Sequence, residues 1–103
     1  MHKMVVLYPA PLDPEHFREY YLNTHIPLAT KMPGIVDWRY SFEVSAGRGE
    51  SPYFAIFEAD FPDKATFVAA VTSPEGVAAI ADVPNYATGG SIALNYPVTT
   101  RPE

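Results

Sequence analysis

Apolar and polar side chains alternate from Val36 to Val44 of this chain, and shorter apolar runs occur on either side of this segment. Val36, Trp38 and Tyr40 lie on one side of the alternating segment, and Asp37 and Arg39 lie on the other. A period of two is typical of a half-buried strand. The predicted strands are residues 3–8, 35–44, 52–61 and 91–96.

Residues 45–51 form a glycine-bearing hairpin loop, and the other two segments between these strands have helical patterns and recognisable start signals. Asp13 followed by Pro14 predicts a helix start, and apolar side chains from there to about residue 32 share a stripe roughly 120° wide. The stripe consists of Phe17, Tyr20, Tyr21, Thr24, Leu28 and Met32. Asp63 predicts the start of a second helix that reaches about residue 71, and Ser73 predicts a short third helix that ends near residue 82.

The order strand, helix, strand, strand, helix, strand predicts an α+β fold with a ferredoxin-like antiparallel sheet and helices on one face. Residues 4–8 and 53–57 are apolar in both alternating phases, so both faces of these strands require burial. Helices cover only one face. We therefore expect a homodimer in which a second copy of the sheet covers the other face.

Length and composition restrict the classes of protein that the chain can represent. Its 103 residues predict a single domain over residues 1–103, and a hydrophobic fraction of 48% excludes a disordered chain. A net charge of −5 with only seven basic residues argues against nucleic acid and against an anionic membrane surface as partners. The apolar runs are too short to cross a bilayer, and the first residues resemble no export signal, so we expect a cytoplasmic protein.

His25 is the strongest candidate for chemistry. It lies at the edge of the apolar helical stripe, two positions before Pro27, so the helix is expected to kink or restart just after it. An imidazole that borders a core and titrates near neutrality suits general acid or base catalysis. The alternative is a structural role, in which His25 hydrogen-bonds a free carbonyl at the kink.

Several sequence features together resemble the EthD family, and they extend over nearly the whole chain. They are Tyr8-Pro9 at the end of the first strand, Asp13-Pro14, Phe17, Tyr20-Tyr21, His25 and Pro27-Leu28 in the first helix, Met32-Pro33-Gly34 after it, Ser73-Pro74-Glu75-Gly76, and residues 81–90. The resemblance implies a ferredoxin-like protomer of the dimeric α+β barrel superfamily, in which His25 matches the family's helix histidine. It also implies a setting in catabolism or secondary metabolism. The family takes its name from a member associated with bacterial degradation of a fuel ether by a cytochrome P450 system. Related barrels include muconolactone isomerases, polyketide cyclases and cofactor-free monooxygenases.

Aromatic and polar residues near His25 are candidates for binding a small hydrophobic molecule. Tyr21 lies one helical turn before His25, although ordinary core packing accounts for such aromatic residues more often. An aromatic wall could line a cavity between sheet and helices, although strands favour such residues for packing alone. The proposed wall comprises Tyr8, Trp38, Tyr40 and Phe42. A loop before the last strand could supply a polar lid, although turn chemistry also explains its residues. That lid comprises Asp82, Asn85 and Tyr86.

These candidates suggest abstraction of a proton next to a carbonyl by His25, with Tyr21, Tyr40 or Trp38 donating a hydrogen bond to the developing oxyanion. A non-catalytic carrier or accessory protein for a monooxygenase system is the alternative. Haem binding through His25 is a third possibility, known among relatives of the barrel. We expect no metal site and no cofactor, because His2 and His16 look solvent-facing and no two histidines have the spacing of metal ligands on a helix.

Overall fold

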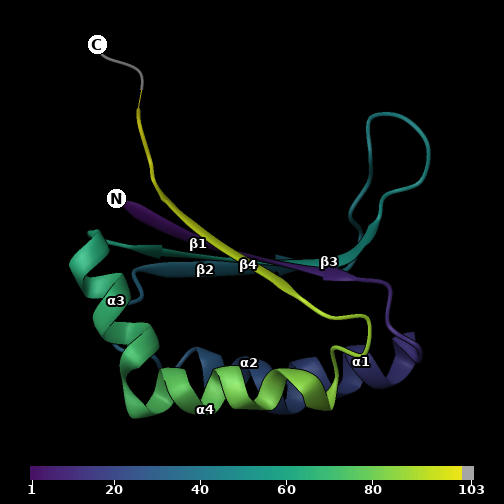
Figure 1. The fold of residues 1–103 in the computed structure, drawn as a ribbon, viewed down its shortest axis with the longest axis horizontal. Coiled ribbons are helices and arrows are strands. Elements are labelled where there is room, and N and C mark those ends of the chain that lie inside the picture. The colour runs from purple at the N-terminus through teal and green to yellow at the C-terminus, as the bar shows by residue number, and fades with distance from the viewer. Residues whose placement is uncertain (101–103) are drawn as a thin grey trace.

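The computed structural model describes residues 1–100, in which one four-stranded sheet lies over a layer of helices (Figure 1). The strands are β1 (His2–Pro9), β2 (Asp37–Ser41), β3 (Tyr53–Phe61) and β4 (Ile92–Pro97). The helices are α1 (Pro14–Tyr20), the π-helix η1 (Tyr21–His25), α2 (Ile26–Ala29), α3 (Lys64–Thr72), α4 (Pro74–Asp82) and the 3₁₀-helix η2 (Val83–Asn85).

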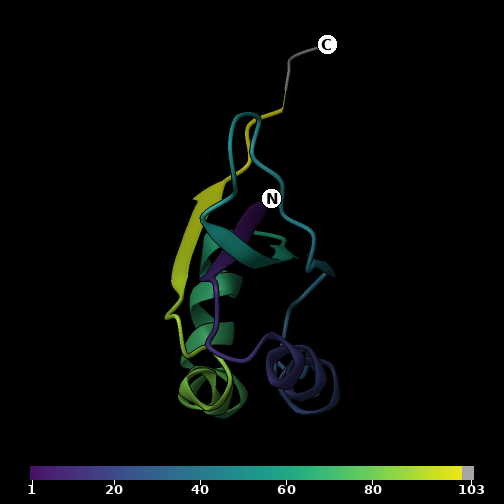
Figure 2. The ribbon, with the colours of Figure 1, turned by 90° about the vertical axis from the view of Figure 1, so that its right-hand side faces the viewer.

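The sheet is antiparallel with the strand order β2-β3-β1-β4. The helices form two segments, residues 14–29 and 64–85, and both lie on the same side of the sheet (Figure 2). This arrangement is the ferredoxin-like fold that the order of elements predicted. The opposite side of the sheet, called the outer face here, carries no helix (Figures 1 and 2).

The core fills the space between sheet and helices. Along β3, Ala55, Phe57, Ala59 and Phe61 are buried, whereas the residues between them are only partly covered. Phe17 of α1 is fully buried, and its ring contacts several aromatic rings from the sheet and from the segment after η2. The alternation places one side of β3 in the core and leaves the other side on the outer face.

Two predicted elements are longer than the corresponding strand and helix in the structure. Pairing of β2 with β3 ends at Ser41, and Phe42 packs against Phe17 instead of continuing the strand. The first helical segment ends at Ala29, because the amides of Lys31 and Met32 bond carbonyls three residues back in a tighter turn. Propensity alone does not specify where a tertiary contact, such as that of Phe42 with Phe17, replaces strand pairing.

The expectation that His2 faces solvent is wrong, whereas His16 is exposed as expected. His2 is the first residue of β1 and is paired on both sides, with Phe61 of β3 and Pro97 of β4. Its side chain is buried, and its Nε2 lies 2.9 Å from Asn95 Oδ1. The strand begins at the second residue, and the imidazole packs against Phe67 of α3, with the ring centres 5.2 Å apart.

Within residues 1–100, no single helix has the length and hydropathy needed to cross a bilayer. Residues 64–72 and 74–85 meet these criteria only as a pair, bent by 68°.

Candidate functional site

The helix that carries His25 changes its winding where the site begins. Residues 21–25 form a π turn, in which the amide of Ile26 bonds the carbonyl of Tyr21. Pro27 follows at the start of α2 and has no amide hydrogen to offer the preceding turn. The helix is therefore irregular next to His25, as predicted. The irregularity is a widened turn that ends at His25, whereas a kink just after His25 was expected.

His25 is only 5% exposed, and it pairs with an acidic residue from the other helical segment. Its Nδ1 lies 3.0 Å from Oδ2 of Asp82, the last residue of α4. Asp82 is buried as well, so water competes little for either group. The two side chains form a buried acid–imidazole pair that joins helices 57 positions apart in sequence.

Hydrogen bonding and burial fix the protonation of this pair. Burial lowers the pKa of His25 below its usual value and outweighs the opposing effect of Asp82. Burial acts to raise the pKa of Asp82, but hydrogen bonds from Tyr20, Asn85 and His25 more than offset it and leave that pKa lowered. At neutral pH a neutral imidazole therefore faces a carboxylate. Because a carboxylate only accepts hydrogen bonds, Nδ1 carries the hydrogen and Nε2 keeps a free lone pair.

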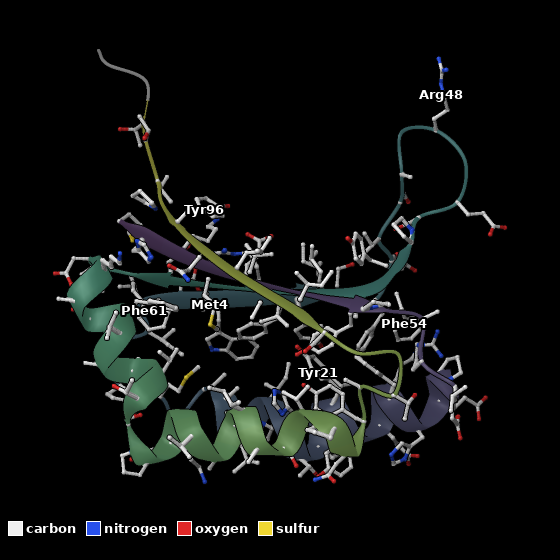
Figure 3. All side chains as sticks on the ribbon, in the orientation of Figure 1. Met4, Tyr21, Arg48, Phe54, Phe61 and Tyr96 are labelled. Atoms are coloured by element: carbon white, nitrogen blue, oxygen red, sulfur yellow. The ribbon has the colours of Figure 1, made fainter. Side chains whose placement is uncertain are left out.

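His25 lines a pocket of about 440 Å³ between the sheet and the helices. The pocket walls are mostly apolar side chains, and its polar members are His25, Tyr8, Ser91 and Asn95. None of the lining residues is Lys, Arg, Asp or Glu. Met4, one of these lining residues, is labelled beneath the sheet in Figure 3. Such a pocket suits a largely apolar, uncharged molecule.

Part of the pocket wall faces solvent. Ile80 on α4 lines the pocket and is 60% exposed, and Ala93 and Asn95, on the helix-facing side of β4, also line it and are exposed. Ser91 and Pro84 also line it and are exposed. The pocket therefore opens between β4 and α4, which gives a ligand a route to His25.

Two buried tyrosines contact the imidazole, and a third, Tyr8, lines the same pocket. The Tyr8 and Tyr86 hydroxyls lie 2.8 Å apart, the Tyr86 ring centre is 4.6 Å from that of His25, and Tyr21 stacks on His25 at 5.4 Å. Burial raises the pKa of all three phenols, so they stay protonated at neutral pH. Tyr8 is the one of the three that lines the pocket, and it can offer a hydroxyl beside His25.

The other candidates occupy different positions. Trp38 and Tyr40 stack on each other on the helix-facing side of the edge strand β2, are about 40% exposed, and do not line this pocket. Asp82 and Asn85 lie beside His25 in one hydrogen-bond network and likewise do not line it. A substrate-binding role for Trp38 and Tyr40 stays a prediction.

The sequence predicted that Asp82 belongs to a polar lid, and it indicated no functional role for Tyr20. The structure makes Asp82 the partner of His25, and the Tyr20 hydroxyl donates to Asp82 Oδ1 over 2.5 Å. Tyr20 precedes His25 by five residues. A period of 3.6 does not place residues five apart on one face, so the helical pattern gave no signal for this contact.

Among residues 1–100, no three His, Asp or Glu side chains are grouped so that they could hold a metal ion.

Comparison with known proteins identifies the family. Residues 9–90 match the model of the EthD domain. A relative described as an uncharacterized 11.0 kDa protein in the thcB-thcC intergenic region of Rhodococcus erythropolis is 33% identical over 94 residues, which cover 91% of each chain.

Solved structures agree with this assignment. An EthD family protein of Bacillus halodurans C-125 superposes with a TM-score of 0.88 and 30% identity, over 96% of this chain and 99% of that one. Two more distant structures share the fold alone. A dimeric ferredoxin-like protein of Jannaschia sp. CCS1 has a TM-score of 0.67 at 19% identity, over 94% and 97% of the two chains. SnoaB of Streptomyces nogalater, described as a cofactor-independent oxygenase, has a TM-score of 0.66 at 16% identity, over 99% and 97%. With a family match over most of its length and a fold shared with these structures, the chain belongs to the EthD family.

Proposed function

We propose that this protein is a small enzyme in which His25 Nε2 abstracts a proton from an uncharged, apolar, oxygenated molecule. The observation that carries the proposal is the buried Asp82–His25 pair beside an apolar pocket. Asp82 engages Nδ1 at 3.0 Å, and the same imidazole lines the pocket. The lone pair on Nε2 is therefore the one available to a ligand.

The chemistry that suits this arrangement is removal of a proton from carbon next to a carbonyl. As Nε2 takes the proton, the C–H electron pair becomes a C=C bond and the carbonyl π pair moves to the oxygen, so that an enolate and an imidazolium result. In this proposal Asp82 stabilises the imidazolium, and the neutral hydroxyl of Tyr8, which lines the same pocket, donates to the enolate oxygen. Return of the proton at another carbon gives isomerisation, and cyclisation or elimination starts from the same enolate.

A non-catalytic carrier is the second candidate, because an open apolar pocket also shelters a hydrophobic intermediate for a partner enzyme. The Bacillus halodurans and Rhodococcus erythropolis relatives carry no stated reaction in their descriptions. The description of SnoaB supports catalysis without a cofactor on this fold. Haem fits less well, because no lysine or arginine lines the pocket to pair with its propionates.

Hydrogen exchange on a simple ketone separates enzyme from carrier. The protein is incubated in D₂O with 2-tetralone, an uncharged bicyclic ketone, and deuterium next to the carbonyl is measured by NMR. We expect exchange above the buffer rate in the wild type and not in His25→Ala. Binding of the ketone without accelerated exchange would favour the carrier.

We also infer that the protein is a homodimer joined through the outer face of the sheet. Ile92, Leu94 and Tyr96 of β4 are 40–51% exposed, and the strand register places them beside Val5 and Leu7 on that face. A related structure of the same fold is described as dimeric. A second copy is the simplest cover for so large an apolar surface.

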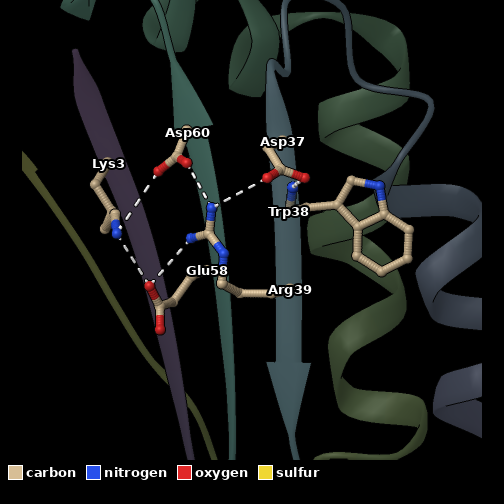
Figure 4. Close-up of polar contacts among 6 residues, drawn as sticks. All are labelled: Lys3, Asp37, Trp38, Arg39, Glu58 and Asp60. Carbon is tan, nitrogen blue, oxygen red and sulfur yellow. Dashed lines mark hydrogen bonds and ion pairs between the residues drawn. The ribbon is translucent and has the colours of Figure 1, made fainter.

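The outer face also carries a charged cluster (Figure 4). Lys3 Nζ lies 3.1 Å from Glu58 Oε1, and the Arg39 guanidinium bonds both Glu58 at 3.2 Å and Asp60 at 2.5 Å. Arg39 beside Asp60 lowers the pKa of that carboxyl, so the cluster stays ionised. Mutual pairing leaves these charges satisfied within one sheet, which reduces the cost of bringing a second sheet close.

A further inference from the structure

The carboxylate of Asp82 is held on both of its oxygens. Oδ2 accepts from His25, and Oδ1 accepts from the Tyr20 hydroxyl at 2.5 Å and from Asn85 Nδ2 at 3.0 Å. Asn85 Nδ2 is also 3.4 Å from the Tyr20 oxygen. The acid is therefore fixed from the side opposite to His25 by two groups that do not line the pocket.

The π turn explains how one helix supplies donors to both oxygens. In a regular α-helix, residues five apart are about 140° apart around the axis, so Tyr20 and His25 would face different directions. A helix with i→i+5 hydrogen bonds brings residues five apart onto one side. The turn over residues 21–25 does so and still lets Tyr21 stack on His25. This widened turn is what gathers Tyr20, Tyr21 and His25 around one acid.

We propose that Tyr20, assisted by Asn85, is a positioning residue that disperses the charge of Asp82 and thereby keeps His25 neutral with Nε2 free. A carboxylate that shares its charge with two donors attracts a proton on the imidazole less strongly than one with a single partner. The catalytic importance of this role of Tyr20 rests on the proposed function. The effect on His25 itself is a property of the free protein.

The groups around His25 leave Asp82 as the main electrostatic influence. Tyr21 stacks on the imidazole from its own helix, Tyr86 contacts it from the segment after η2, and Tyr8 shares the pocket from β1. Burial raises the pKa of these three phenols, so none is charged near neutrality. His16 is exposed, with its Nε2 3.2 Å from the Asn85 carbonyl and its ring 5.6 Å from that of Tyr20.

The test is the titration of His25 in Tyr20→Phe, followed by NMR of the ¹⁵N-labelled imidazole in the free protein. Phenylalanine keeps the ring that stacks on Tyr86 and removes only the hydroxyl. We expect the His25 midpoint to rise by about one pH unit, because a charge-assisted hydrogen bond to Asp82 is lost. His16, which contacts Tyr20 and Asn85 in the wild type, is followed in the same spectra so that its titration is not mistaken for that of His25.

Asn85→Ala provides a second variant at an exposed position, with a smaller shift expected in the same direction. Tyr53→Phe is the matched control, because it removes the hydroxyl of a tyrosine that takes no part in the Asp82 network. It should leave the His25 midpoint unchanged. If Tyr20→Phe folds and titrates within about 0.2 pH unit of the wild type, Tyr20 is only a packing residue and the proposal is overturned. Should Tyr20→Phe not fold, an unchanged midpoint in Asn85→Ala would overturn it. Neither measurement uses a substrate, so a failure of the proposed function would be recognised separately, by the absence of deuterium exchange.

Discussion

At the scale of single residues, the behaviour of His25 results from two opposed influences. Burial disfavours the imidazolium, and the carboxylate of Asp82 favours it. The lowered pKa shows that burial prevails, so the imidazole is neutral at neutral pH, as the proposed role of general base requires. In the proposed mechanism, the same carboxylate stabilises the imidazole after proton transfer, when the ring carries a positive charge.

Replacing His25 by alanine is expected to abolish proton transfer and to preserve the fold, because alanine suits a helix and Asp82 retains its bonds from Tyr20 and Asn85. Exchange of a bound ketone should fall by about a hundredfold to ten-thousandfold, the usual contribution of a general base. Binding of the ketone, measured by calorimetry, should change little. A variant that binds and exchanges at the wild-type rate would show that His25 is structural.

The pH dependence of the reaction follows from the direction of the pKa shift. Because the pKa of His25 is lowered, the imidazole remains a base down to pH values below about 6.5, the usual midpoint for histidine. The apparent kcat/KM for exchange should be flat above pH 6.5 and fall in more acidic buffer. A midpoint at or above 6.5 would mean that Asp82 dominates over burial.

At the scale of elements, the site depends on how closely α4 packs against α3. Gly76 in the first turn of α4 is buried, and a Cβ added there would lie 2.3 Å from the Ala70 carbonyl oxygen and 2.6 Å from that of Val71. Both obstacles are backbone atoms, so the two helices must separate to admit a methyl group. Asp82 lies at the far end of α4, and its position depends on this junction.

Gly76→Ala should therefore lower the free energy of unfolding by about 2 kcal/mol, within the usual range for an overpacked site. In a domain of this size each kcal/mol lowers Tm by roughly 4–8 °C, which thermal unfolding followed by circular dichroism will detect. Gly47→Ala is the matched control, because a Cβ there meets nothing within 4 Å. Equal Tm values for the two variants would contradict the close packing of α3 and α4.

At the scale of the whole molecule, the inferred dimer depends on the outer face of the sheet. Ile92 projects there opposite Leu7 of β1 and is 40% exposed. We expect the wild-type chain to sediment near twice 11.4 kDa and Ile92→Glu to dissociate, because a carboxylate in an apolar interface loses its hydration without gaining a partner. Val77→Glu, a matched change at an exposed position on α4, should leave the mass unchanged. A folded wild-type monomer at micromolar concentration would rule out the dimer.

Local signals in the sequence were sufficient for the framework. Asp13, Asp63 and Ser73 each accept a hydrogen bond from the first turn of the helix that they were expected to start. The order of strands and helices followed from hydrophobic periodicity, and the family followed from motifs spread along the chain. Signals of this kind act within a few residues, so they can be read without knowledge of the fold.

The sequence by itself also determined that His25 borders the core, because a residue at the edge of an apolar stripe has few other places to lie. Only the tertiary structure decided what it meets there. Asp82 comes from a helix 57 positions away, and Tyr20 reaches that acid through a turn with a period that apolar patterning does not encode. The pocket likewise lies beside Tyr8 and opens near β4, away from Trp38, because strand order and helix placement determine which apolar side chains share a space. Local preferences determine the elements, whereas the partners of a buried polar group depend on how distant elements pack.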